Sequence, residues 1–186
     1  MRKNFGAKAI LYPMPVLIIG SYDENGAPDA MNAAWGGISE ETQISICISA
    51  NHKTTNNILA KGAFTVSVAD VENVVAADYV GVFSGNKEPN KIEKAGWHAV
   101  KSELVDAPLF EELPLALECK LVSYDEESCR LVGEIVNVCA DERILGADGI
   151  IDLAKFIPIT YDPVHHTYRK LGDVVGKAFS DGFKLK

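Results

Sequence analysis

The chain lacks any apolar run long enough to cross a membrane. Its strongest apolar run near the start, residues 15–20, is far shorter than the roughly 20 residues that a membrane-spanning helix needs, and no secretory cleavage pattern follows it. Excess positive charge is also lacking, since 18 Lys and Arg against 26 Asp and Glu give a net charge of −8. We therefore expect a cytoplasmic protein without a membrane or nucleic-acid surface, in which any anion site is local.

The motifs of several enzyme classes are missing as well. No Gly-x-Gly-x-x-Gly follows a predicted strand, so a nicotinamide is not expected on a Rossmann site. Residues 172–178 come close to the phosphate-loop motif of nucleotide hydrolases, but the segment is one residue short and has Ala178 where a magnesium-binding hydroxyl belongs. These departures exclude nucleotide hydrolysis. His165 and His166 would point in different directions on an extended chain, so no metal site is predicted. No catalytic triad can be assigned.

Cysteine is sparse and scattered. The four cysteines stand at positions 47, 119, 129 and 139, without a Cys-x-x-Cys pair and among strand-like neighbours. This spacing predicts neither a zinc ribbon nor a redox pair. We expect them to be buried, reduced thiols, because free Cys usually behaves as a small core residue.

Short strands dominate what is present. Residues 43–49 alternate, with Ile44, Ile46 and Ile48 on one face, and Asn25-Gly26 after an apolar run predicts a hairpin. The remaining predicted elements are strands at 16–22, 64–68, 115–124, 131–139, 99–102 and 156–160, and helices at 55–61, 71–80 and 90–95. Residues 106–114 are interpreted as a connection. With 47% hydrophobic residues in 186, we expect a single domain, 1–186, that is mainly β: a closed antiparallel barrel with short helices.

The segment 51–58 is a candidate anion site. It joins the strand at 43–49 to a predicted helix and carries His52, Lys53, Thr54 and Thr55. The first amides of a helix are unpaired and the helix dipole favours negative charge there, so a phosphate would fit. The alternative is that Thr54 only caps the helix while the rest is a solvated loop.

The segment 31–37 is a candidate site for a planar ligand. Small residues surround a lone Trp35, so a flat ring could approach the backbone closely. The alternative is that Trp35 packs on the end of the barrel while the glycines make a turn.

Several segments in a fixed order are similar to those of one family. They are residues 12–16 (YPMPV), 32–37 (NAAWGG), 52–55 (HKTT) with 57–58, 62–66 (GAFTV), 77–81 (ADYVG) with 84–85, 105–109 (VDAPL), and 168–179. On these segments, which span nearly the whole chain, it resembles the flavin reductase-like family of FMN-binding split barrels, and within it the flavoredoxin branch.

The resemblance implies a six-stranded Greek-key split barrel that forms a homodimer, with one FMN per subunit near the interface. It assigns the FMN phosphate to the loop at 52–55 and the flavin ring to two segments, 33–35 and 47–49. Two further segments, 78–79 and 83–85, are expected to complete the pocket or its nicotinamide side. The resulting cofactor-binding residues are Asn32, Ala33, Ala34, Trp35, Cys47, Ile48, Ser49, His52, Lys53, Thr54, Thr55, Asp78 and Ser84.

The resemblance implies an FMN-dependent oxidoreductase that takes hydride from NADH or NADPH and passes electrons to free flavin or a redox protein acceptor. No catalytic side chain is expected, because the flavin carries the chemistry, and Cys47 could serve only as a packing residue. Relatives often have a basic residue followed by an aromatic after the Ser-Gly loop, whereas this chain has Lys91-Ile92. The alternatives are an FMN-binding electron-transfer module that nicotinamides do not reduce directly, and a barrel for another planar ligand.

Overall fold

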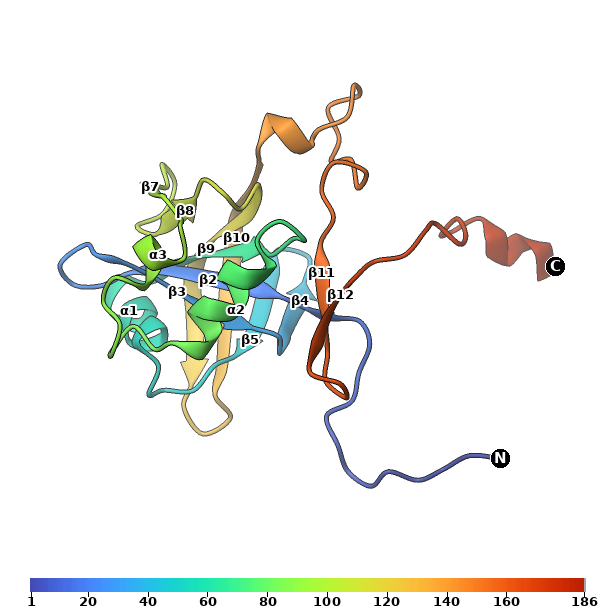
Figure 1. Cartoon of the computed structure of the whole chain (residues 1–186), viewed down its shortest axis with the longest axis horizontal. Coiled ribbons are helices and arrows are strands. Elements are labelled where there is room, and N and C mark those ends of the chain that lie inside the picture. Colours follow the sequence, from blue (N-terminus) through green and yellow to red (C-terminus); the bar gives the residue numbers. More distant parts are fainter. Residues whose placement is uncertain (186) are drawn as a thin grey trace.

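The computed structural model, which describes residues 1–185, is built around one curled antiparallel sheet (Figure 1). Its seven strands lie in the order β3-β2-β6-β9-β10-β5-β4. Their bounds are β2 (Leu17–Tyr22), β3 (Pro28–Ala33), β4 (Gly36–Glu40), β5 (Gln43–Cys47), β6 (Ala63–Val68), β9 (Leu115–Asp125) and β10 (Arg130–Ala140).

The sheet closes toward a barrel at one corner. Its edge strands, β3 and β4, are separated in sequence only by Ala34 and Trp35, so the two edges must meet there. The Trp35 carbonyl accepts a hydrogen bond from the Cys47 amide at 2.8 Å, which fixes this corner against β5. The expected mainly β split barrel is confirmed. Its sheet has seven strands rather than six, because residues 36–40 form β4 where the glycines suggested a turn.

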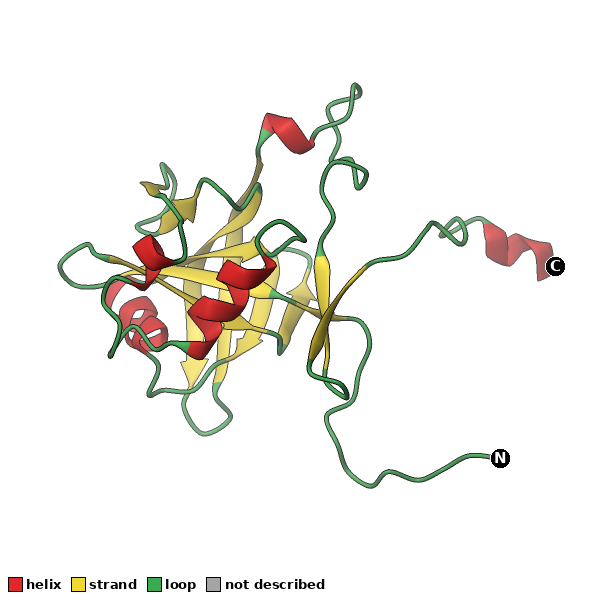
Figure 2. Ribbon diagram, in the orientation of Figure 1, coloured by secondary structure: helices red, strands yellow, loops and turns green. Residues whose placement is uncertain are grey.

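Smaller elements surround the barrel. One further sheet joins β1 (Met14–Pro15), β11 (Ile159–Asp162) and β12 (Thr167–Lys170), and another joins β7 (Ala99–Lys101) and β8 (Pro108–Phe110). The helices are α1 (Lys53–Lys61), α2 (Val74–Val82) and α3 (Lys91–Lys94), with short 3₁₀ turns at Glu142–Ile144 and Asp181–Leu185. Figure 2 shows α1 and α2 lying over the sheet, where both pack against β3.

Strand β2 is buried on both faces, which explains why its first half, residues 17–19, is a run of large apolar side chains. Leu17 and Ile19 point into the barrel core, together with Ile44 and Ile46 of β5. Ile18 points the opposite way, into a second core beneath α2 and α3. The barrel core buries the face of β5 that the sequence alternation predicted, and the second core holds the helices at a fixed place beside β3.

The sequence located most elements but misplaced several boundaries. The predicted helix at 71–80 begins only at Val74, because the Asp70 carboxylate accepts two backbone amides and holds residues 72–73 in a turn. The strand expected at 156–160 starts at Ile159, because residues 157–158 bridge to the same turn. The connection at 106–114 contains β8. Burial of all four cysteines was wrong, since only Cys119 is buried and Cys47 is exposed.

The two ends of the chain project from the barrel as arms (Figure 1). Residues 1–13 are exposed, and so are most residues after 170. Val175 and Phe179, in the C-terminal arm, are fully exposed. Within residues 1–185, no helix has the length and apolar character needed to span a bilayer.

Candidate functional site

The segment 52–55 lies at the N-terminus of α1, where the sequence predicted a loop leading into a helix, but the helix begins at Lys53, two residues before the predicted start. His52 occupies the N-cap position with extended backbone angles, and its side chain makes no capping hydrogen bond. Helix α1 ends at Gly62, whose φ of 68° allows the left-handed turn there. The first amides of α1 therefore receive no side-chain cap and remain available to an anion.

Thr54 and Thr55 do not cap the helix; both are buried and both hydroxyls donate elsewhere. The Thr54 hydroxyl donates to Asp29 Oδ2 at 2.6 Å, and the Thr55 hydroxyl donates to the Ser49 carbonyl at 2.8 Å. The reading of Thr54 as a helix cap is therefore wrong. Because each hydroxyl has one proton, neither side chain has a donor left for a ligand, although their backbone amides do.

Lys53 brings positive charge to the start of α1. Its Nζ lies 3.2 Å from Asp23 Oδ2, in the hairpin turn between β2 and β3. Burial raises the pKa of Asp23, but the amides of Ala27 and Asn25 together with the Lys53 ammonium outweigh burial, and the pKa lies below its ordinary value. The Asp23 carboxylate thus holds Lys53 at the pocket, and an anion that binds Lys53 must compete with this carboxylate.

Three pockets follow one another along the end of β3. The first, of about 230 Å³, is lined by His52, Lys53 and Ser84 among others. The second, of about 350 Å³, shares Asn32, Gly81 and Val82 with the first. The third, of about 440 Å³, shares Ala34 with the second and is lined also by Trp35 and by residues 8–11 and 13–15 of the N-terminal segment. The shared lining residues make the three pockets neighbours between the N-terminus of α1 and the barrel corner.

The middle pocket is lined by polar groups from distant parts of the chain. Asn32 donates to the Ala77 carbonyl at 3.0 Å, and the Tyr168 hydroxyl donates to Asp78 Oδ1 at 2.8 Å. Burial and the Asp78 carboxylate raise the pKa of Tyr168, so this phenol keeps its proton. Gly81 is required beside Asn32, because a Cβ there would lie 2.9 Å from the Asn32 Cβ.

The predicted residues outside the three pockets occupy different places. Ala33 and Ile48 are buried in the barrel core, so only their backbone could reach a ligand. Cys47 is exposed on β5, with its Sγ 3.9 Å from the Ser128 carbonyl. Ser49 is half-buried and anchors Thr55 through its carbonyl. The structure therefore brings together the residues at 32, 34–35, 52–54, 78 and 84, but places 33, 47–49 and 55 behind or beside them.

Several pocket residues were missed by sequence reasoning. Tyr161, His166 and Tyr168, from the β11–β12 hairpin, line the middle pocket, although the hairpin is some 80 residues from α2 in sequence. His166 Nδ1 lies 2.8 Å from the Tyr161 hydroxyl, whereas the His165 ring contacts the Asp162 carboxylate, so the two imidazoles have different partners. The positive φ of His166, 54°, places this residue in the turn between β11 and β12.

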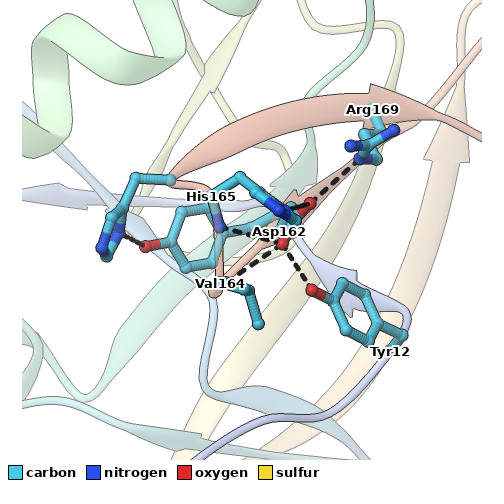
Figure 3. Close-up of polar contacts among 7 residues, drawn as sticks. Tyr12, Asp162, Val164, His165 and Arg169 are labelled. Carbon is cyan, nitrogen blue, oxygen red and sulfur yellow. Dashed lines mark hydrogen bonds and ion pairs between the residues drawn. The ribbon is translucent and has the colours of Figure 1, made fainter.

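Asp162 ties the N-terminal arm to this hairpin. Figure 3 shows Tyr12, His165 and Arg169 pointing toward its carboxylate. The pKa of Asp162 lies far below its ordinary value, mainly because the Tyr12 hydroxyl donates a hydrogen bond to the carboxylate. Burial acts in the opposite direction. Hydrogen bonds from His165, the Val164 amide and Arg169 lower the pKa further. The cluster fixes the β11–β12 hairpin, and with it one wall of the middle pocket.

The residues present fit a mononucleotide with a planar ring. An uncapped helix N-terminus with Lys53 suits a phosphate, and the small residues beside the exposed Trp35 leave room for a flat ring. The neighbouring pockets between them share lining residues. This arrangement matches the expectation that one end of the ligand is charged and the other is aromatic.

Comparison with known proteins gives one consistent result. A family model described as "Flavin reductase like domain" matches residues 9–165. The flavoredoxin of Desulfovibrio vulgaris (Miyazaki F) is 38% identical, with a TM-score of 0.93 over 98% of this chain and 100% of its own. Flavoredoxin from Methanosarcina acetivorans is 28% identical, with a TM-score of 0.85 over 100% and 98%.

A further relative is longer than this chain, and the match covers only part of it. An uncharacterized protein of Aeropyrum pernix is 26% identical over 170 residues, which is 86% of this chain but 64% of the relative. This chain therefore spans somewhat less than two thirds of that relative's length.

Proposed function

The chain belongs to the flavin reductase-like domain family, and from that premise we propose that it is an FMN-dependent oxidoreductase that takes hydride from NADH or NADPH. The electrons then pass to free flavin or to a redox protein acceptor. The observation that carries this proposal is the row of three pockets that begins at the uncapped amides of α1 and ends at Ala34 and Trp35.

We assign the FMN phosphate to the first pocket. His52, Lys53 and Ser84 line it, and the amides of Thr54 and Thr55 face the same end of α1. The two threonine hydroxyls hold the loop in shape through Asp29 and the Ser49 carbonyl, and do not donate to the phosphate.

We assign the flavin ring to the middle pocket and the corner beside it. Asn32, Ala34 and Asp78 line the middle pocket, and Trp35 lies next to Ala34 in the third. Bound FMN supplies a ring that accepts hydride and returns electrons, so the protein has to supply binding, orientation and electrostatics. The protonated Tyr168 and the backbone at 33–35 and 47–49 would orient the ring without any side-chain nucleophile.

The test begins with FMN binding and ends with its reduction. Purified protein should take up FMN, and anaerobic mixing with NADH or NADPH should bleach the flavin absorbance within a catalytic time. Protein that takes up no FMN would contradict the proposal as a whole.

The second candidate is an FMN-binding electron-transfer module that nicotinamides do not reduce directly. Burial of Lys91 favours it, because this basic residue is engaged in an ion pair and is not free to contact a reductant. Rapid uptake of FMN without bleaching by either nicotinamide, combined with reduction by a protein donor, would support this candidate over the first.

We also propose that two copies form a homodimer through the terminal arms. Apolar side chains of the C-terminal arm, including Val174, Val175 and Phe179, are almost fully exposed to water, which is an unfavourable state for a fixed extended arm. Light scattering on the full chain should give about twice 20.1 kDa, and truncation after Leu171 should shift the mass toward the monomer. A full-length chain at 20.1 kDa would refute the dimer.

A further inference from the structure

His166 occupies a backbone position that favours glycine. Its φ of 54° lies in the left-handed region, which a residue with a Cβ adopts at a cost and which glycine adopts freely. The His166 amide donates to the Asp162 carbonyl at 2.9 Å, which closes the turn between β11 and β12. The hairpin thus presents an imidazole at a place where the backbone alone does not call for one.

The turn that carries this imidazole is held in a fixed shape. The Asp162 carboxylate, which is buried, accepts the amides of Val164 at 3.0 Å and His165 at 3.2 Å. Its other oxygen accepts Arg169 Nε at 3.0 Å. A side chain that contacts a ligand needs a support of this kind, because its own position is then defined.

One nitrogen of the His166 ring is engaged and the other is open. Nδ1 lies 2.8 Å from the Tyr161 hydroxyl, which has no other acceptor within residues 1–185. The phenol proton therefore goes to Nδ1, and the imidazole keeps its own proton on Nε2. Nε2 has no partner in the same part of the chain, so His166 brings an unpaired N–H donor to the middle pocket that it lines.

Other polar side chains of the middle pocket already have partners. Asn32 donates to the Ala77 carbonyl, and Tyr168 donates its single hydroxyl proton to Asp78. Asp78 supplies the one carboxylate among the described residues that line this pocket. A ligand that becomes negatively charged here is repelled by Asp78, and His166 is placed to offset that repulsion.

We propose that His166 contacts the flavin ring in the middle pocket and favours its reduced form. A ring that accepts one hydride takes up two electrons and one proton, so it gains one negative charge. The Nε2–H donor then makes a charge-assisted hydrogen bond, which is about twice as strong as a neutral one. His166 keeps its proton throughout, and the hydride comes from the nicotinamide.

This inference rests on the proposed function, because it assumes that the ring of FMN occupies the middle pocket. It extends that function by assigning to one side chain the preference between the oxidised and the reduced cofactor.

The test measures the midpoint potential of bound FMN, which gives the ratio of the dissociation constants of its two redox forms. The protein with FMN is titrated anaerobically with dithionite at constant pH, beside a dye of known potential. His166→Gly suits the backbone angle and removes the imidazole. Reduced FMN should bind about tenfold more weakly relative to oxidised FMN, as expected for one lost hydrogen bond to a charged group. This change lowers the midpoint of a two-electron couple by about 30 mV.

Two further variants separate this role from a structural one. His165→Gly makes the same substitution at the neighbouring residue, whose ring contacts Asp162 and does not line the pocket, so the midpoint should stay that of the natural chain. Tyr161→Phe removes the phenol that fixes the imidazole proton on Nε2. Part of the preference for reduced FMN should therefore be lost, while the affinity for oxidised FMN should change by less than about threefold.

An unchanged midpoint in His166→Gly would overturn the inference, even if both redox forms bound more weakly, because an equal loss marks a structural residue. An equal shift in His165→Gly would overturn it as well. Failure of the proposed function is distinguishable. Bound FMN that dithionite reduces and nicotinamides do not would contradict the function alone, and the midpoints would still decide the role of His166.

Discussion

Lys53 offers the sharpest test of where the phosphate binds. It is the first residue of α1, and its ammonium lies 3.2 Å from Asp23 Oδ2 with both side chains about one fifth exposed. Lys53→Met keeps most of the apolar stem and removes the charge. Because a partly exposed pair of this kind contributes only about 0–1 kcal/mol, the free energy of unfolding should hardly change.

The effect on FMN should be much larger than the effect on folding. A hydrogen bond from a charged group contributes about 1.5–3 kcal/mol, which corresponds to about 10- to 150-fold weaker FMN binding. Asp23→Asn should act in the opposite direction, because it frees Lys53 while Oδ1 can still accept the turn amides of Asn25 and Ala27. The gain is limited to what the pair holds, about 0.2–1 kcal/mol or up to about fivefold.

The assay is quenching of flavin fluorescence, titrated with FMN and with riboflavin at low and high ionic strength. Lys61→Met is the control, because Lys61 lies at the other end of the same helix, 3.6 Å from Asp106 Oδ2. Only Lys53→Met should lose affinity for FMN, and the loss should shrink as salt screens the charge. Equal FMN affinity in the two lysine variants, or weaker binding in Asp23→Asn, would refute the assignment of the phosphate to this loop.

Three further predictions concern the scaffold. Gly133→Ala should lower the free energy of unfolding by about 1–3 kcal/mol, because its Cβ would lie 2.3 Å from Phe64 Cζ in the barrel core; in thermal melts, Phe64→Leu should relieve part of this loss. Asp162→Asn should lower the melting temperature at neutral pH. Its folded-state pKa lies below the ordinary value of about 3.9, so its contribution is present above about pH 4 and is lost as the pH falls further, and the two melting curves should converge in acid. Burial raises the pKa of the Cys119 thiol to about 12, so a thiol reagent at mildly alkaline pH should modify the exposed Cys47 first and Cys119 only after unfolding, as mass spectrometry of the labelled peptides would show. Rapid labelling of Cys119 in the folded chain would contradict its place in the barrel core.

Local patterns in the sequence were sufficient for many elements. The alternation at 43–49 correctly identified the buried face of β5, and Asn25-Gly26 correctly marked the hairpin between β2 and β3. The ordered family segments correctly identified the family. The alternation and the turn pair depend on neighbours a few residues apart, and the family segments are recognised by their order along the chain, so all three are visible without the fold.

Other features required the fold because they depend on long-range pairing. The glycines at 36–37 suggested a turn, yet Gly36 lies in β4, where a Cβ would come within 3.1 Å of the Ser45 carbonyl on the neighbouring strand. Thr54 looked like a helix cap, but its hydroxyl finds Asp29 on β3 instead. No periodicity or spacing in the sequence indicates either partner.

By itself, the sequence determined the family, through its resemblance to segments that follow one another in a fixed order. It also determined the mainly β character and the position of the loop that begins α1, because side-chain alternation and helix-end signals act over a few residues. The tertiary structure alone decided that the edges of the sheet meet at Ala34 and Trp35, and that Lys91 lies under the pocket beside Asp29. The reason is physical: curling the sheet brings together side chains that are dozens of residues apart, and burial then decides which of their charges and hydrogen bonds must be paired.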